Sequence, residues 1–158
     1  MLIEILRSLF NRDLNKLKEE IELFQTESQL WIIDKNISNS AGNLCLHLIG
    51  NLNTYIGAAL GKTGYIRNRP LEFSAKDVSK GELILKIEET ILMVNNTLDI
   101  LTEADLELIY PQEFLEREEA SGFFLVHLST HLGYHLGQIN YHRRLLDFDA
   151  EKDHEPEI

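Results

Sequence analysis

The spacing of apolar residues predicts four long helices. Between residues 2 and 25, apolar side chains recur every three to five positions, which is the pattern of an amphipathic helix. Residues 43–60 are apolar on most sides, so we expect this helix to lie centrally in a bundle. A Ser-x-x-Glu capping pattern begins a third helix over 79–101, and a fourth covers about 120–146. With three prolines and no alternating β-branched segments, the chain is expected to be all-α.

The remaining segments are predicted to be connections. Residues 61–78 contain Gly64, Asn68 and Pro70 and are expected to be irregular, whereas residues 102–105 can start a short helical turn that Pro111 ends. Residues 1–146 have the length and hydrophobicity of one domain. The acidic stretch 147–158 is predicted to be a solvated, poorly ordered tail.

The charge of the chain argues against nucleic-acid and membrane partners. The net charge is −11, which repels phosphate backbones. There is no basic amphipathic stripe, and no apolar run approaches the roughly 20 residues that span a bilayer. The first residues mix acids and bases, unlike a secretory signal, and the single cysteine, Cys45, fits a reducing compartment. We therefore expect a cytoplasmic protein.

Four of the six histidines fall in the last expected helix, at His127, His131, His135 and His142. At about 100° per residue, these four and Gln138 share an arc of about 80°. Leucine, isoleucine and phenylalanine flank this arc, while Ser129 and Gly133 are among the residues on the opposite side. The histidines are accordingly expected in the middle of the buried stripe of the helix, with Ser129 on its solvated side.

A cluster of buried imidazoles predicts a metal site. A single histidine on an apolar face is more often a hydrogen-bonded core residue, but several neighbouring rings find few partners among apolar side chains. The spacing of His131 and His135 stacks two rings on successive helical turns, so both can face one ion. His47 lies in the most apolar helix, with Asn51 one turn later, and a facing helix can bring it opposite this pair.

Several other kinds of site are excluded by the residues present. Leucine follows both His127 and His131, where a zinc-protease HExxH motif requires glutamate. No Glu-x-x-His pair of a di-iron bundle precedes the histidines in the required frame. The sequence also has no glycine-rich phosphate loop and no G-x-S-x-G elbow.

The motifs HLIGNL, beginning at His47, and HxxxHLGQI, beginning at His131, resemble the DinB-like superfamily of metal-binding four-helix bundles. That superfamily includes bacillithiol S-transferases and mycothiol-dependent maleylpyruvate isomerases, and the similarity is closest to a bacterial branch of unassigned function. It extends over nearly the whole chain, including the SNSAGNL lead into the second helix. The resemblance implies an up-down-down-up bundle with a long crossover from helix two to helix three, which agrees with the irregular stretch 61–78.

By position, the resemblance makes His47, His131 and His135 the ligands of a divalent metal, zinc or nickel, and implies a homodimer. His127, Gln138 and Asn51 are candidates for orienting the ligands, although His127 and Gln138 can equally be packing residues. The resemblance gives no role to His142, which is expected near the bundle end, and His154 falls in the acidic tail.

Thiol transfer is the chemistry that this site favours. Three neutral imidazoles leave the ion its positive charge, which would acidify a small-molecule thiol and ready it to attack an electrophile. Arg67 and Arg69 are candidates for binding an anionic substrate, or alternatively pair with Glu72 on a solvated loop. A metal-dependent S-transferase in detoxification or stress response is the first hypothesis. A noncatalytic bundle with a structural ion or a binding role, and a metallohydrolase, are the alternatives.

Overall fold

The computed structural model describes residues 1–111, 113–115 and 117–147. These residues form four long helices and no named strand, so the all-α prediction is confirmed. The long helices are α1 (Leu2–Leu23), α2 (Ala41–Leu52), α4 (Lys80–Ile100) and α5 (Ser121–Leu146). The shorter elements are η1 (Ser28–Trp31), η2 (Asn53–Ala58), α3 (Arg69–Ser74) and η3 (Asp105–Glu107). Each predicted long helix is present, and η2 continues α2 as a π-helical segment.

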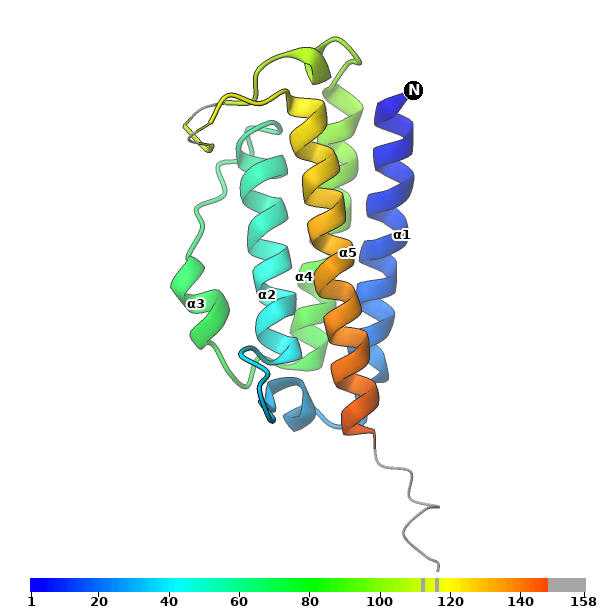
Figure 1. The fold of residues 1–158 in the computed structure, drawn as a ribbon, viewed down its shortest axis with the longest axis vertical. Coiled ribbons are helices and arrows are strands. Elements are labelled where there is room, and N and C mark those ends of the chain that lie inside the picture. Colours follow the sequence, from blue (N-terminus) through cyan, green and yellow to red (C-terminus); the bar gives the residue numbers. More distant parts are fainter. Residues whose placement is uncertain (112, 116, 148–158) are drawn as a thin grey trace, which may run out of the picture.

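The long helices are arranged as the predicted up-down-down-up bundle (Figure 1). Helices α1 and α5 run in one direction, and α2 and α4 run in the other. Helix α1 packs against α4 and α5, and α2 packs against the same two helices from the opposite corner. Because α2 and α4 are parallel, the chain between them must return along the full length of the bundle. This crossover, which carries α3, lies beside α2.

A serine side chain caps the start of both α2 and α4. The hydroxyl of Ser79 accepts a hydrogen bond from the Glu82 amide at 3.1 Å, as the capping pattern predicts. The Glu82 carboxylate lies 3.5 Å from Lys86 and thus supports the first turns of the same helix. At α2, the hydroxyl of Ser40 accepts from the Asn43 amide at 3.1 Å, although no cap was predicted there. These caps fix where the two helices start relative to the crossover.

The prediction that the whole of residues 61–78 is irregular was wrong for its middle. Helix α3 begins after Asn68, whose side chain accepts from the Leu71 amide, and Pro70 lies in the first turn. Proline in a first helical turn costs no hydrogen bond, because the amides there have no intrahelical partner. The Asn-x-Pro pattern is therefore a helix start here. It was interpreted as a helix breaker.

The buried stripe of α5 is also displaced from its predicted centre. Leu125, Leu132 and Ile139 are fully buried, and Ser129 is 7% exposed although it was expected in solvent. With His127 at zero, these four positions lie between about 120° and 200°, so the histidine arc is the margin of the stripe. Helix α5 contacts both α1 and α2, and the close packing on α1 determines which side is deepest. His127 is exposed, and His131 and His135 are half-buried.

Buried polar contacts tie α5 to its neighbours. Glu20 of α1 is 1% exposed and accepts hydrogen bonds from Arg143 at 2.7 Å and Asn140 at 2.8 Å. Arg143 also pairs with Asp147, at 2.8 Å, where α5 ends. The rest of the predicted tail, residues 148–158 with His154, lies outside the described residues. Among the helices described, none is long and apolar enough to cross a membrane.

Candidate metal centre

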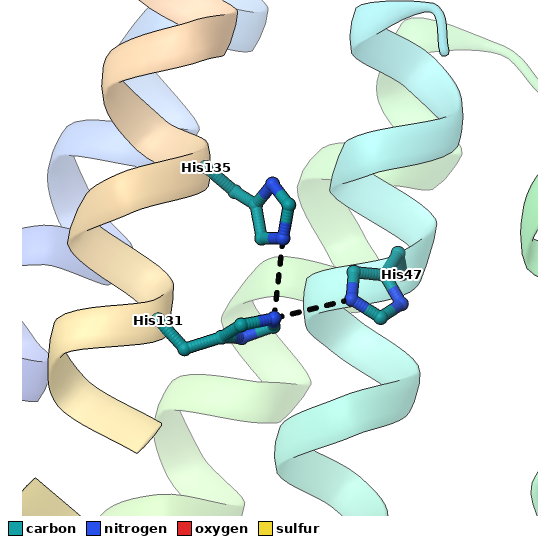
Figure 2. Close-up of side chains that lie close together, drawn as sticks. All are labelled: His47, His131 and His135. Atoms are coloured by element: carbon teal, nitrogen blue, oxygen red, sulfur yellow. Dashed lines mark hydrogen bonds between the residues drawn. The ribbon is translucent and has the colours of Figure 1, made fainter. Parts of the chain in front are cut away.

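Three histidines from two helices meet between α2 and α5 (Figure 2). His131 and His135 project from successive turns of α5, and His47 faces them from α2. The Nε2 atom of His131 lies 3.1 Å from that of His135 and 3.4 Å from that of His47. Among the described residues, these three form a group whose candidate ligand atoms all lie within 4.8 Å of one another. The structure thus brings together the three residues predicted to bind a metal.

Neighbouring side chains orient two of the rings from behind. The Nδ1 atom of His47 lies 3.1 Å from the Glu72 carboxylate, and the Nδ1 atom of His135 lies 2.7 Å from the side-chain oxygen of Gln138. A carboxylate and an amide oxygen only accept hydrogen bonds, so each Nδ1 donates in these two contacts. Nη2 of Arg67 also lies 3.4 Å from Nδ1 of His47, but this contact is longer than the one to Glu72. In a neutral imidazole this leaves the Nε2 lone pair free. Both lone pairs therefore point toward the centre of the cluster.

This donor set fits a divalent cation. The three inward nitrogens cannot all find hydrogen-bond partners among themselves. Even if His131 Nε2 carries a proton, it can donate a good hydrogen bond to only one of the other two nitrogens. Ligand nitrogens about 2.1 Å from a tetrahedral ion lie about 3.4 Å apart, close to the two separations observed. The pattern of Nδ1 donating to a carboxylate or carbonyl while Nε2 points inward is typical of histidine ligands. His47, His131 and His135 would hold the ion.

Burial keeps two of the three cluster histidines, His47 and His131, unprotonated. Desolvation, with smaller contributions from the charges of neighbouring histidines and Arg67, lowers the pKa of His131 to about 4. Desolvation also lowers the pKa of His47, against the opposing effect of Glu72. A metal ion competes with protons for the same lone pairs. His47 and His131 are therefore neutral and ready to bind at pH values near 7.

The metal-free protein is expected to lose stability as pH falls from about 6.5 toward about 4. In this window the unfolded chain protonates His131 at its ordinary pKa of 6.5, whereas the folded protein keeps it neutral down to about 4. Protons then favour unfolding. Urea unfolding with a chelator, at about pH 7 and about pH 5, measures the loss. A His131→Phe variant should lose less between the two pH values, and an equal loss would contradict this origin.

Arg67 pairs with Glu72, as the alternative to substrate binding predicted, but the burial of this pair and its contact with His47 were not predicted. Glu72 is 6% exposed, and Arg67 forms a bidentate pair with it, Nε to Oε1 at 2.6 Å and Nη2 to Oε2 at 2.9 Å. The side chain of Asn43 donates to the Glu72 carbonyl at 2.9 Å and so anchors α3 to α2. Gly50 lies against the carboxylate so closely that a Cβ there would overlap it. The helix start at Asn68-Arg69-Pro70 was the signal that could have placed Glu72 on a packed helix.

Two cavities adjoin the histidine cluster. The first, of about 420 Å³, has all three cluster histidines in its wall, together with Arg67, Arg69 and Phe73. The second, of about 800 Å³, extends toward Arg117, Phe114 and His127. Asn51, Tyr55 and His131 line both. A molecule of appreciable size can accordingly reach the inward nitrogens from one side.

The other predicted site residues lie around these cavities. Arg67 is held by Glu72, and the guanidinium of Arg69 lies 5.3 Å from the Phe73 ring centre. Asn51 is buried, and its Oδ1 has no hydrogen-bond partner among the described residues. His127 stacks on Phe124 at 5.8 Å between ring centres and lies 6.4 Å from the His131 ring. Their predicted roles in binding or orienting ligands stay predictions.

Cys45 is not part of the site. It is fully buried in the core, and burial raises the pKa of its thiol to about 12. A protonated thiol is a poor metal ligand. Residues two apart on a helix also point in different directions, so Cys45 is not placed to join His47.

Comparison with known proteins places the chain in a family without adding a function. The model of a family described as "Protein of unknown function (DUF1572)" matches residues 2–152. No curated protein matches the sequence. The match covers the four long helices and the three cluster histidines. The chain belongs to the DUF1572 family, a member of the DinB-like superfamily that its histidine motifs resemble.

Proposed function

We propose that this protein binds one divalent metal ion, zinc or nickel, and is a metal-dependent thiol S-transferase. The observation that carries the proposal is the convergence of three imidazole nitrogens beside open cavities of about 420 and 800 Å³. A structural zinc site is normally closed by four protein ligands, whereas a catalytic site keeps a position open. The described residues supply three candidate ligands and leave room for a substrate.

The ion supplies the activation of the thiol. Held by three neutral imidazoles, a divalent ion would favour the thiolate form of a small molecule bound beside it. The chain's own residues position the reactants. Gln138 and Glu72 orient His135 and His47, and Asn51 and Tyr55 line the space in which the reacting groups would meet.

The surroundings of the cluster favour transfer over hydrolysis. Hydrolysis needs a general base that can take a proton from water at the site. The carboxylate beside the cluster, Glu72, faces the outer nitrogen of His47, and Arg67 holds both of its oxygens. A thiol, being more acidic than water, needs less help in losing its proton. Thiol transfer accordingly fits these residues better.

The proposal predicts thiol-conjugating activity that depends on the metal. Zinc- or nickel-loaded protein is expected to accelerate the reaction of bacillithiol, glutathione or coenzyme A with monochlorobimane. In that reaction the thiol proton goes to solvent, the sulfur forms a bond to carbon, and chloride leaves. Fluorescence of the conjugate measures the rate. The chelated protein and a His131→Ala/His135→Ala variant should both fall to the uncatalysed rate.

Equal rates with and without the ion, for all three thiols, would overturn the S-transferase proposal and favour a noncatalytic role for the ion. The homodimer implied by the family resemblance and the cytoplasmic location expected from the sequence stay predictions.

A further inference from the structure

A third cavity lies at the end of the bundle, next to the histidine cluster. It encloses about 410 Å³, within the range of about 300–1,000 Å³ of small-molecule pockets. Its wall comes from the loop before α2, residues 36–39, and from the last turns of α5. Of the residues that line it, only Gln138 was given a candidate role from the sequence. The cavity is therefore a separate candidate for ligand binding.

His142 in this wall lacks the partners that a buried imidazole needs. The residue is 4% exposed, and neither ring nitrogen has a hydrogen-bond partner among the described residues. Desolvation lowers its pKa, although the negative charge of Asp34 opposes the shift. A neutral imidazole has one donor and one acceptor, and leaving both unpaired in a buried place is costly. Both nitrogens are shielded in this position, so the ring must turn toward the cavity for a ligand there to supply a partner.

The other polar groups of the wall indicate what kind of ligand this is. They are the side-chain amides of Asn36, Asn39 and Gln138 and the hydroxyls of Ser38 and Tyr141. Of the described residues that line the cavity, none carries a formal charge at neutral pH. Arg143, on the same turn as His142, already pairs with Glu20 and Asp147. The cavity thus matches an uncharged molecule with hydroxyl or amide groups better than an anion or a cation.

The cavity is connected to the metal centre through shared residues. Asn39 and Leu44 line both this cavity and the one that contains the three cluster histidines. Gln138 lines the cavity as well, and its oxygen lies 2.7 Å from Nδ1 of His135. A single molecule can therefore place one end beside His142 and its other end beside the cluster.

We propose that the His142 cavity binds the uncharged, hydroxyl- or amide-bearing part of the small molecule whose reactive group lies at the histidine cluster. This inference deepens the proposed function and rests on it for the reactive end. The His142 imidazole and the amides of Asn36, Asn39 and Gln138 are the specificity-determining groups. The cluster histidines have no part in recognising this end of the ligand.

A charge-matched pair of probes tests the recognition. Panthenol is uncharged and carries hydroxyls and an amide, and pantothenate has a similar skeleton ending in a carboxylate. Titration of protein labelled with ¹⁵N in its histidines should shift the His142 ring signals with panthenol and leave those of His127 in place. Pantothenate is expected to bind at least about tenfold more weakly, because the wall has no cation to compensate a buried carboxylate.

Two variants establish that the wall residues are responsible. His142→Leu should weaken panthenol binding about tenfold, as the loss of a buried hydrogen-bonding group predicts. Asn36→Leu changes an exposed residue of the same wall and should also weaken binding, so a folding failure of the first variant leaves the test intact. Unchanged binding by both folded variants, or no shift of His142 in the wild type, would overturn the proposal.

Adding the thiol separates this inference from the proposed function. Pantetheine, which shares the two pantoyl hydroxyls and the amide of panthenol and adds a second amide and a terminal thiol, should bind more tightly to zinc-loaded than to zinc-free protein. Panthenol should bind both equally. A His142 shift with panthenol in a protein that takes up no zinc would support the cavity site and sink the proposed function. Zinc uptake and thiol conjugation without any His142 shift would support the proposed function and overturn the cavity site.

Discussion

Replacing His131 and His135 together with alanine is expected to abolish metal binding. Protein purified without a histidine tag should contain about one zinc or nickel ion per chain, and the double variant should contain none. The physical reason is that the variant keeps only His47, one of the three converging imidazoles. Mass spectrometry of the metal content, before and after incubation with each ion, is the measurement.

The free energy of unfolding provides a second measure of metal binding. At a free zinc concentration of about 100 times the dissociation constant, binding to the folded state should add about 2.7 kcal/mol to the free energy of unfolding. The double variant should gain nothing. His127→Ala is the matched control, since His127 lies on the same helix but is exposed and outside the cluster. Absence of metal from the wild type under all conditions would make the cluster a hydrogen-bonded feature of the core.

Replacing Glu72 with glutamine is expected to lower metal affinity by about 10- to 100-fold, although Glu72 does not face the ion site. Its Oε2 atom accepts a hydrogen bond from Nδ1 of His47, with 3.1 Å between the two atoms, and thereby directs the Nε2 lone pair inward. A glutamine at this position loses the charge that both His47 and Arg67 use. Competition with a zinc-binding dye measures the affinity, and denaturant unfolding measures the stability of the same samples.

Glu20 provides the control for this second prediction. It is also a buried glutamate paired with an arginine, Arg143 at 2.7 Å, but it lies between α1 and α5 without contact to the cluster. Both Glu72→Gln and Glu20→Gln should lose stability, on the order of 3 kcal/mol for a disrupted buried pair. Only Glu72→Gln should lose metal affinity. Equal effects of the two variants on zinc binding would show that Glu72 acts through stability alone.

Much of the histidine cluster could be predicted from the sequence, because the relevant information is local. The positions of His131 and His135 one helical turn apart place their rings on the same side of any helix that contains both. The apolar surroundings of His47 likewise indicate that its helix is central, whatever the helix packs against. Residues close together in the chain thus determined the four long helices and which two of them carry the three histidines.

The support for the ligands could not be predicted in this way. Glu72 and His47 are 25 positions apart, and their contact depends on how the crossover returns past α2. The sequence left open whether Arg67 binds a substrate or pairs with Glu72, and nothing in the sequence pattern showed that this pair is buried. The same holds for His142, whose unpaired nitrogens become evident only once the loop of residues 36–39 lies beside α5.

By itself, the sequence determined the all-α class, the extent of the four long helices and the side of α5 that carries the histidines. Helical periodicity and capping depend on neighbours within a few residues, so these features can be predicted from the local sequence. Only the tertiary structure decided that the histidine arc lies at the margin of the buried stripe, that Glu72 and Gln138 orient the rings, and that cavities open beside the cluster. The reason is that a helix has several apolar sides, and the packing of distant segments selects which of them is buried and which faces a cavity.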